Sequence, residues 1–188
     1  MNAQTNLPTA DNGLSVEALI EAQNNLAARA KIAQFTWCTE CEWMNGMHTR
    51  SNMKRFSGLG EKHTHTTSYS IHADYPKCFA AEDNGPTPTE ILLTALASCL
   101  SANIVTLAQN HNIQLSNMTT RIEGDMNVYG ITGMGSTIHN NLKAIRINIA
   151  IHSDSSLEDI KAIIAQAKKY STVFNIIEDQ VNINITIN

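Results

Sequence analysis

The sequence predicts an α+β fold with antiparallel sheet and one buried helix. Several segments alternate apolar and polar residues, the pattern of strands with one buried face, and such strands are typical of antiparallel sheets. The segment 91–107 is apolar or small on nearly every face, which predicts a helix buried on more than one side. After a first helix, the expected elements follow the order β, α, β, α, β.

Length and charge limit the function classes. A chain of 188 residues is long enough for one domain with a real core, and we expect a single domain over residues 15–188 after a loose, polar terminus at 1–14. The net charge of -4 disfavours nucleic acid and an anionic membrane surface as partners. Residues 1–15 lack the pattern of a signal peptide, and 91–107 is too polar and too short for a bilayer span, so we expect a cytoplasmic protein.

The first part of the chain predicts a helix and then antiparallel strands. Ser15 is a suitable N-cap for an amphipathic helix over 16–30. Apolar and polar residues alternate over 31–37 and, more weakly, over 65–73, which predicts two strands. Between them, Asn45-Gly46 predicts a hairpin turn.

The clearest boundary is the start of the central helix at 87–90. Thr87 provides an N-cap, Pro88 suits the first helical position, and Glu90 completes a capping box. We expect the helix to run to Asn110 or His111, because Asn112 is a plausible left-handed stop.

Alternation predicts the remaining strands. These lie at 118–129, 144–152 and 181–187, with a glycine-rich loop over 130–141. A helix over 157–170 is capped either by Ser155 with Glu158 or by Ser156 with Asp159.

Three cysteines have weak functional signals. Cys38 and Cys41 form a C-x-x-C motif, but no second pair follows, and the neighbouring Trp37 and Trp43 favour a strand over the helix start of a redox motif. Cys78 lies in a predicted loop, where only geometry decides whether it reaches another thiol.

The histidines predict no metal site. His63 and His65 would share one face of a strand, near His48 or His72, but no carboxylate or thiol ligand is fixed beside them. We therefore interpret them as surface residues and expect neither a metal nor another cofactor.

Four segments together resemble the OsmC/Ohr superfamily over residues 30–188, in a branch that lacks the family's resolving cysteine. The most specific element is a Pro-Thr-Glu helix start with a cysteine nine residues after Glu90. The segments, in chain order, are DNGPTPTEILLTALASCLSANIV, NMTTRIEGDMNVY, IRINIAIHSD and STVFNIIEDQVNINITI.

The resemblance implies an intertwined homodimer, in which antiparallel sheets wrap around the buried central helices, and reduction of organic hydroperoxides by Cys99. It also implies an activating arginine, for which Arg50 is the first candidate and Arg55 the second. The family's glutamate one residue after the motif proline is Thr89 in this chain, and Glu90, which matches its neighbour, is the candidate glutamate. The family's cysteine-proline-valine motif is replaced by Ser171-Thr172-Val173, so the resolving thiol is absent. If Ser171 takes the place of that thiol, the resemblance implies that it lies near Cys99.

The leading hypothesis is therefore a one-cysteine peroxidase or peroxide-responsive protein. Cys99 would be oxidised by an apolar hydroperoxide to a sulfenic acid and reduced by an external thiol. The alternatives are a core cysteine with no chemistry and a non-catalytic binder of apolar small molecules that keeps the family pocket. A hydrolase that uses Cys99 with His111 is disfavoured, because twelve helical residues separate them by about 18 Å.

Overall fold

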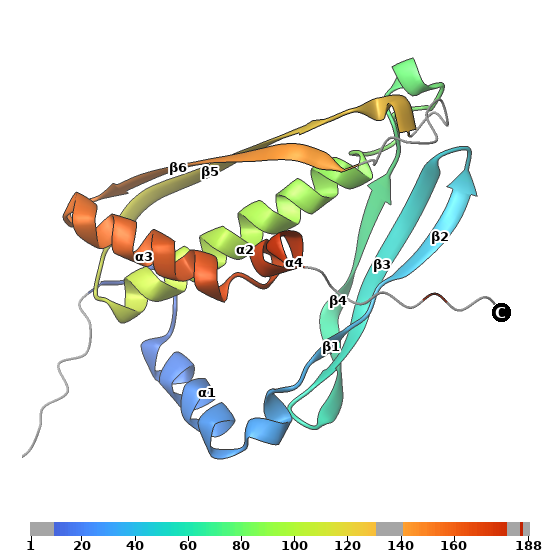
Figure 1. The fold of residues 1–188 in the computed structure, drawn as a ribbon. Helices are drawn as coiled ribbons and strands as arrows, with labels where there is room; N and C mark the ends of the chain where they lie inside the picture. The colour runs from blue at the N-terminus through green and yellow to red at the C-terminus, as the bar shows by residue number, and fades with distance from the viewer. Residues whose placement is uncertain (1–9, 131–140, 180–184, 186–188) are drawn as a thin grey trace, which may run out of the picture. The chain divides into compact units, whose positions relative to one another are not determined.

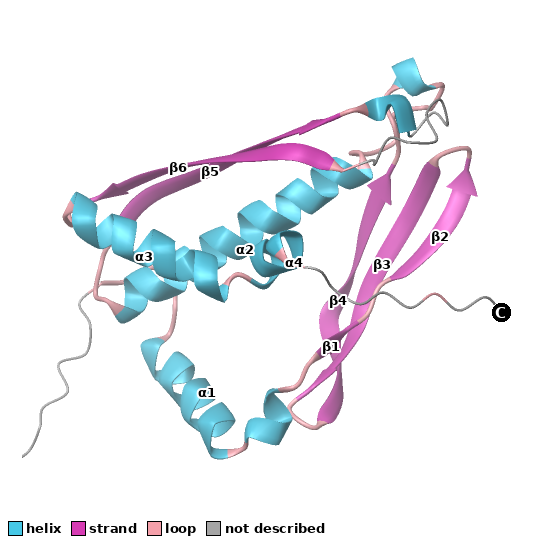
Figure 2. Ribbon diagram, in the orientation of Figure 1, coloured by secondary structure: helices cyan, strands magenta, loops and turns pink. Residues whose placement is uncertain are grey.

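The structure is a computed structural model that describes residues 10–130, 141–179 and 185. Its contacts form two compact units: a helix unit, Met1–Leu14 with Leu93–Asn188, and a sheet unit, Ser15–Leu92. The α+β class with antiparallel sheets is confirmed (Figure 2). The expected single domain over 15–188 stays a prediction.

In the part of the chain that the structure describes, the helix unit is built on one antiparallel strand pair covered by helices. β5 (Leu115–Met126) pairs with β6 (Leu142–Ser153), with Ile122 opposite Ile147. The helices are α2 (Pro88–Asn110), α3 (Leu157–Tyr170) and α4 (Thr172–Glu178), and α2 and α3 lie along the same face of the strand pair (Figure 1). The buried core comprises Ile104, Leu107, Ala108, Ile113, Ile163 and Ala167.

Local capping rules place the helix boundaries. The Thr87 hydroxyl accepts a hydrogen bond from the Glu90 backbone at 3.2 Å, and the Glu90 carboxylate accepts from the Thr87 backbone at 2.7 Å. Asn112 has the predicted left-handed conformation, with φ of 55°. At α3 the sequence left two caps open, and the structure selects Ser156, whose side chain accepts from the Asp159 backbone.

The sheet unit contains helix α1 (Val16–Ala28) and four antiparallel strands. β3 (His48–Gly58) lies centrally and pairs with β4 (Glu61–Ala73) on one side. On its other side it pairs with β1 (Thr36–Trp37) and β2 (Glu40–Asn45) in succession. The predicted Asn45-Gly46 hairpin is confirmed, with a φ of 57° at Gly46 that glycine adopts without strain.

The predicted strand over 31–37 is wrong for most of its length. Residues Ala30–Ala33 form a short 3-10 helix, η1, and only Thr36–Trp37 is strand. The reason is the partner strand: in this register Gly58, the last residue of β3, falls opposite Phe35, and the chain then turns through Leu59 and Gly60, so residues before Phe35 have no strand to pair with.

The last residues of the predicted loose terminus are held in place. The Gln109 side chain, which is fully buried, donates to the Ala10 carbonyl at 2.6 Å and accepts from the Asn12 backbone at 2.9 Å. Asn112 and Gln114 accept hydrogen bonds from the Ala10 and Asp11 backbones, each at 2.8 Å. The predicted loop at 130–141, apart from its two ends, and the strand at 181–187, apart from Ile185, lie outside the described residues.

Helix α2 buries less of its surface than the sequence predicts. Only 28% of its most apolar 18-residue window is buried in the single chain. Contrary to the sequence-based expectation, α2 is long and apolar enough to cross a membrane by length and composition alone, a criterion that core helices of soluble proteins also meet. The absence of a membrane partner stays a prediction.

Candidate active site around Cys99

Cys99 lies on α2, half-buried, and two side chains donate hydrogen bonds to its sulfur. The Ser171 Oγ donates to Sγ at 3.2 Å, and the Asn103 Nδ2 approaches Sγ at 3.8 Å. Asn103 lies four residues after Cys99, so both project from the same face of the helix. Two hydrogen-bond donors therefore face one sulfur.

Ser171 is fixed by the chain that surrounds it. It joins α3 to α4, has no exposed surface, and caps α4 by accepting a hydrogen bond from the Phe174 backbone at 3.2 Å. Because the backbone N–H supplies that proton, the proton of the serine hydroxyl is left for Cys99. The expected proximity of Ser171 and Cys99, inferred from the family motif, is therefore present in the structure.

Glu90, predicted as a site residue, has a structural role in the chain. Its carboxylate accepts from both the backbone and the hydroxyl of Thr87, at 2.7 and 2.8 Å. The backbone hydrogen bond, followed by the hydroxyl, lowers the pKa of Glu90 below its ordinary value of 4.5. Nine helical residues place Glu90 about 13 Å from Cys99 and on the opposite face of α2. The geometry therefore supports the cap and gives Glu90 no contact with the sulfur.

Arg50 lies on β3 in the sheet unit, whereas Cys99 lies in the helix unit. Its Nη2 pairs with Glu42 on the neighbouring strand at 2.6 Å, its side chain is 40% exposed, and its Nε is buried without a hydrogen-bond partner among the described residues. Arg55 is 72% exposed and pairs with Glu40 at 3.5 Å. The pairing of either arginine with Cys99 stays a prediction.

Cys38, Cys41 and Cys78 belong to the sheet unit, and so do four of the histidines: His48, His63, His65 and His72. All four cysteines are free, and Cys38, Cys41 and Cys78 are exposed. His48 and His72 share a hydrogen bond of 2.8 Å between Nε2 and Nδ1. Within the described residues there is no group of three side chains that could hold a metal ion. His111 follows the last residue of α2, and twelve residues of helical rise place it about 18 Å from Cys99.

Sequence analysis missed Asn103 as a neighbour of Cys99. Its position four residues along a predicted helix was the signal that could have found it. The Ser171 contact joins residues 72 positions apart, so only the family motif pointed to it.

Solved structures of low sequence identity share the fold. An OsmC-like protein from Mycoplasma pneumoniae is 18% identical, with a TM-score of 0.58, covering 77% of this chain and 89% of that one. An OsmC-like protein of unknown function from Vibrio cholerae is 12% identical, with a TM-score of 0.53 and coverages of 76% and 93%. A putative osmotic stress induced and detoxification response protein from Psychrobacter arcticus is 17% identical, with a TM-score of 0.51 and coverages of 73% and 85%.

The family model described as OsmC-like protein matches residues 81–186, a range that includes α2, Cys99 and Ser171. No curated protein matches the chain. The matched range covers more than half of the sequence. The chain therefore belongs to the OsmC-like protein family.

Proposed function

We propose that this protein is a thiol-dependent reductase of organic hydroperoxides, or a closely related oxidative-stress protein, that uses Cys99 alone as its redox thiol. The observation that carries the proposal is the hydrogen bond from Ser171 to the Cys99 sulfur at 3.2 Å. A detoxification role named for the Psychrobacter structure is consistent with it.

The reaction follows from the chemistry of a thiolate. The Cys99 sulfur attacks the terminal oxygen of the hydroperoxide, an S–O bond forms, the O–O bond breaks, and the leaving alkoxide takes a proton to become an alcohol. Cys99 is then a sulfenic acid. The Ser171 hydroxyl stabilises the thiolate before the attack and remains a donor to the oxidised sulfur.

Reduction requires thiols from outside the chain. At the position where Ser171 meets Cys99, a hydroxyl cannot form a disulfide. One external thiol therefore displaces water from the sulfenic acid and forms a mixed disulfide, and a second thiol releases Cys99 and leaves as the external disulfide. Four free cysteines suit a reducing compartment, so the proposal keeps the cytoplasm as its location.

The proposal includes a homodimer in which Arg50 supplies a positive charge near Cys99. The unsatisfied Nε of Arg50 and the sparsely buried face of α2 support an additional contact surface. The same apolar surface suits a hydroperoxide with an apolar tail. Sedimentation of a monomer at micromolar concentration would contradict the homodimer without affecting the thiol chemistry.

The direct test is turnover of cumene hydroperoxide with dithiothreitol as the reductant. Cys99→Ser should abolish turnover, whereas Cys78→Ser, which removes an exposed thiol, should retain it. Wild-type turnover by Cys99→Ser contradicts the proposal. Tight binding of an apolar ligand without peroxide turnover by the wild type favours the non-catalytic binder instead.

A second test examines the Ser171 contact. Ser171→Ala should slow oxidation of Cys99 by about tenfold, because a hydrogen bond to a charged group contributes roughly 1.5 kcal/mol. Ser171→Cys should trap the Cys99 sulfenic acid as an intrachain disulfide. Peptide mapping decides the second outcome: a free introduced thiol beside an oxidised Cys99 contradicts the assignment of Ser171 to the resolving position.

A further inference from the structure

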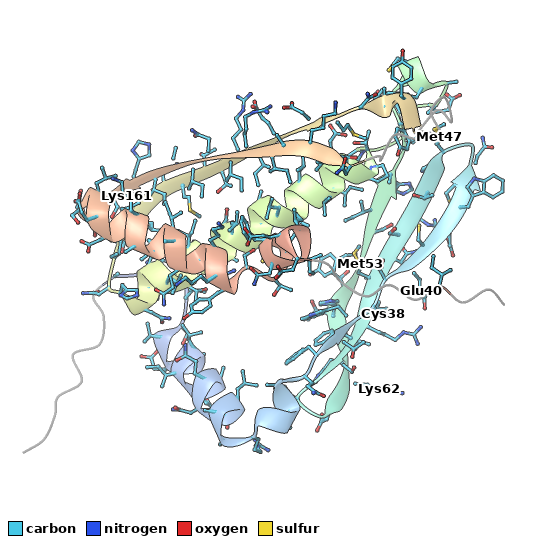
Figure 3. The ribbon with its side chains drawn as sticks, viewed as in Figure 1. Cys38, Glu40, Met47, Met53, Lys62 and Lys161 are labelled. Atoms are coloured by element: carbon cyan, nitrogen blue, oxygen red, sulfur yellow. The ribbon has the colours of Figure 1, made fainter. Side chains whose placement is uncertain are left out.

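A second thiol, Cys38, lies in a hollow on the sheet unit that is lined by cationic and hydroxyl side chains. The hollow has a volume of about 360 Å³ and is lined by Cys38, Glu40, Asn52, Lys54, Arg55, Thr64 and Ser68. An adjoining hollow of about 330 Å³ shares Cys38, Arg55 and Thr64 and adds Lys62. Figure 3 shows Cys38 between Glu40 and Lys62 along the sheet.

Interrupted strand pairing accompanies this hollow on both sides of β3. Trp37 pairs with Phe56 and Glu40 with Asn52, so β3 contains one more residue than its neighbours across that interval. On the β4 side the register shifts between Met53 and Arg55. Such irregularities re-aim side chains and are common beside functional sites.

The charges at the hollow favour an anion. Lys54 and Lys62 have no ion pair in the part of the chain that the structure describes, and Arg55 is paired only with Glu40 at 3.5 Å. Three cations against one carboxylate form a local positive field on a protein whose net charge is -4. Cys38 and these three cations are exposed, so a small solute can reach all of them.

The two faces of this part of the sheet differ. Trp37, Phe56 and His63 stack in sequence, with ring centroids 5.1 Å apart at each step. Thr36 precedes Trp37 in β1 and, because side chains alternate along a strand, projects to the other face. Cys38 follows directly after β1 and lines both hollows together with Arg55 and Thr64. The thiol therefore lies among hydroxyl and cationic side chains, and the second hollow also includes Phe56 and His63 in its lining.

We propose that the hollow binds small disulfides that carry carboxylates and that Cys38 exchanges with them to form a mixed disulfide. Arg55 and Lys54 hold the carboxylates, and the hydroxyls of Thr64 and Ser68 donate to them. In the reaction the Cys38 thiolate attacks one sulfur of the disulfide, a new S–S bond forms, the original S–S bond breaks, and the other half leaves as a thiolate. This inference is independent of the peroxidase proposal, because it uses none of the groups around Cys99.

The test compares a negatively charged disulfide probe with a neutral one. The probes are 5,5′-dithiobis(2-nitrobenzoate), which carries two carboxylates, and 2,2′-dithiodipyridine, which is neutral. The readout is the rate of the carboxylate probe at Cys38 divided by the rate of the neutral probe, measured by peptide mass mapping on the full chain. This ratio should fall by about tenfold in the Lys54→Gln, Arg55→Gln double variant. Raising the salt concentration to about 0.5 M should lower the wild-type ratio in the same direction.

The controls separate the hollow from general surface charge. Lys161→Gln removes an exposed cation on α3 and should leave the ratio at Cys38 unchanged (Figure 3). Cys41 lines neither hollow, so its ratio should not fall in the double variant. An unchanged ratio at Cys38 in the double variant, or a Cys38 that reacts with neither probe, overturns the proposal.

Discussion

The helix unit and the sheet unit differ in how they bury apolar surface. In the helix unit, Ile104 is fully buried and Ile163 is 2% exposed, between two strands and the packed helices. In the sheet unit, Trp37 is 69% exposed and Trp43 is 73% exposed, although strand pairing there is extensive. The first unit has its own core, whereas the second is a hydrogen-bonded sheet that lacks a covering layer within itself.

The difference shows that backbone pairing alone does not complete the sheet unit. A sheet needs a layer packed against its apolar face, and α1, the helix in the same unit, buries no residue. The stacked rings of Phe35, Trp37 and Phe56 are the surface that such a layer would cover. A second copy of the chain is the layer that we propose.

The largest expected effect lies in the helix unit. Ile104→Ala removes a fully buried side chain from the core, so we expect a loss of about 2–5 kcal/mol in the free energy of unfolding. The loss should not depend on protein concentration if the core is complete within one chain. Chemical denaturation at two concentrations measures it, with Leu157→Ala, 61% exposed, as the control that stays near wild type.

A smaller effect, with a different signature, is expected in the sheet unit. Trp37→Ala should raise the dissociation constant of the dimer about thirtyfold, which corresponds to roughly 2 kcal/mol for a buried aromatic anchor. Analytical ultracentrifugation over a dilution series measures it. If Trp37→Ala behaves like the exposed Leu157→Ala, the aromatic face is not part of the interface.

Local sequence rules predicted the elements that depend on neighbouring residues. The Thr87 and Glu90 cap, the left-handed Asn112 and the alternation around Ile147 require only short-range chemistry, and each is present in the structure. The predicted strand over 31–37 failed because strand formation requires a partner, and β3 ends at Gly58, which falls opposite Phe35, so earlier residues have no strand beside them.

Contacts between residues far apart in the sequence were harder to predict. The Ser171 contact with Cys99 was expected only through the family motif, and periodicity gave no signal for it. The attachment of Ala10 by Gln109 was not predicted at all, because a polar terminus and a polar residue near the end of an apolar helix each suggest solvent exposure. Both contacts join hydrogen-bonding groups that lie far apart in the sequence, so local sequence patterns do not reveal them.

The attachment of the N-terminal segment offers a third prediction. Gln109→Ala removes the two hydrogen bonds that Gln109 makes with Ala10 and Asn12, which should cost about 1–2 kcal/mol and speed amide exchange at Asn12. Hydrogen exchange read residue by residue measures it, with Gln23→Ala on the exposed face of α1 as the control. Unchanged protection at Asn12 contradicts a clamp that ties this segment to the helix unit.

The smallest expected effect lies at Glu90, on the first turn of the helix that passes from the sheet unit into the helix unit. Glu90→Ala removes the acceptor of the Thr87 backbone and hydroxyl, which should cost about 1 kcal/mol by the usual value of a helix cap. Because these donors lower the pKa of Glu90 below 4.5, the stabilisation is present above pH 4.5 and is lost as the pH falls through the lowered value. The difference in the free energy of unfolding between wild type and Glu90→Ala should therefore shrink in acid. Glu90→Gln keeps an acceptor oxygen and does not titrate, so the cap in that variant should not weaken as the pH falls.

The same variants test whether Glu90 acts on the thiol. Since it lies on the opposite face of α2, the rate of Cys99 oxidation should stay within about twofold of wild type in both. A tenfold slower oxidation in Glu90→Gln at unchanged stability would return Glu90 to the catalytic site, by way of a partner chain.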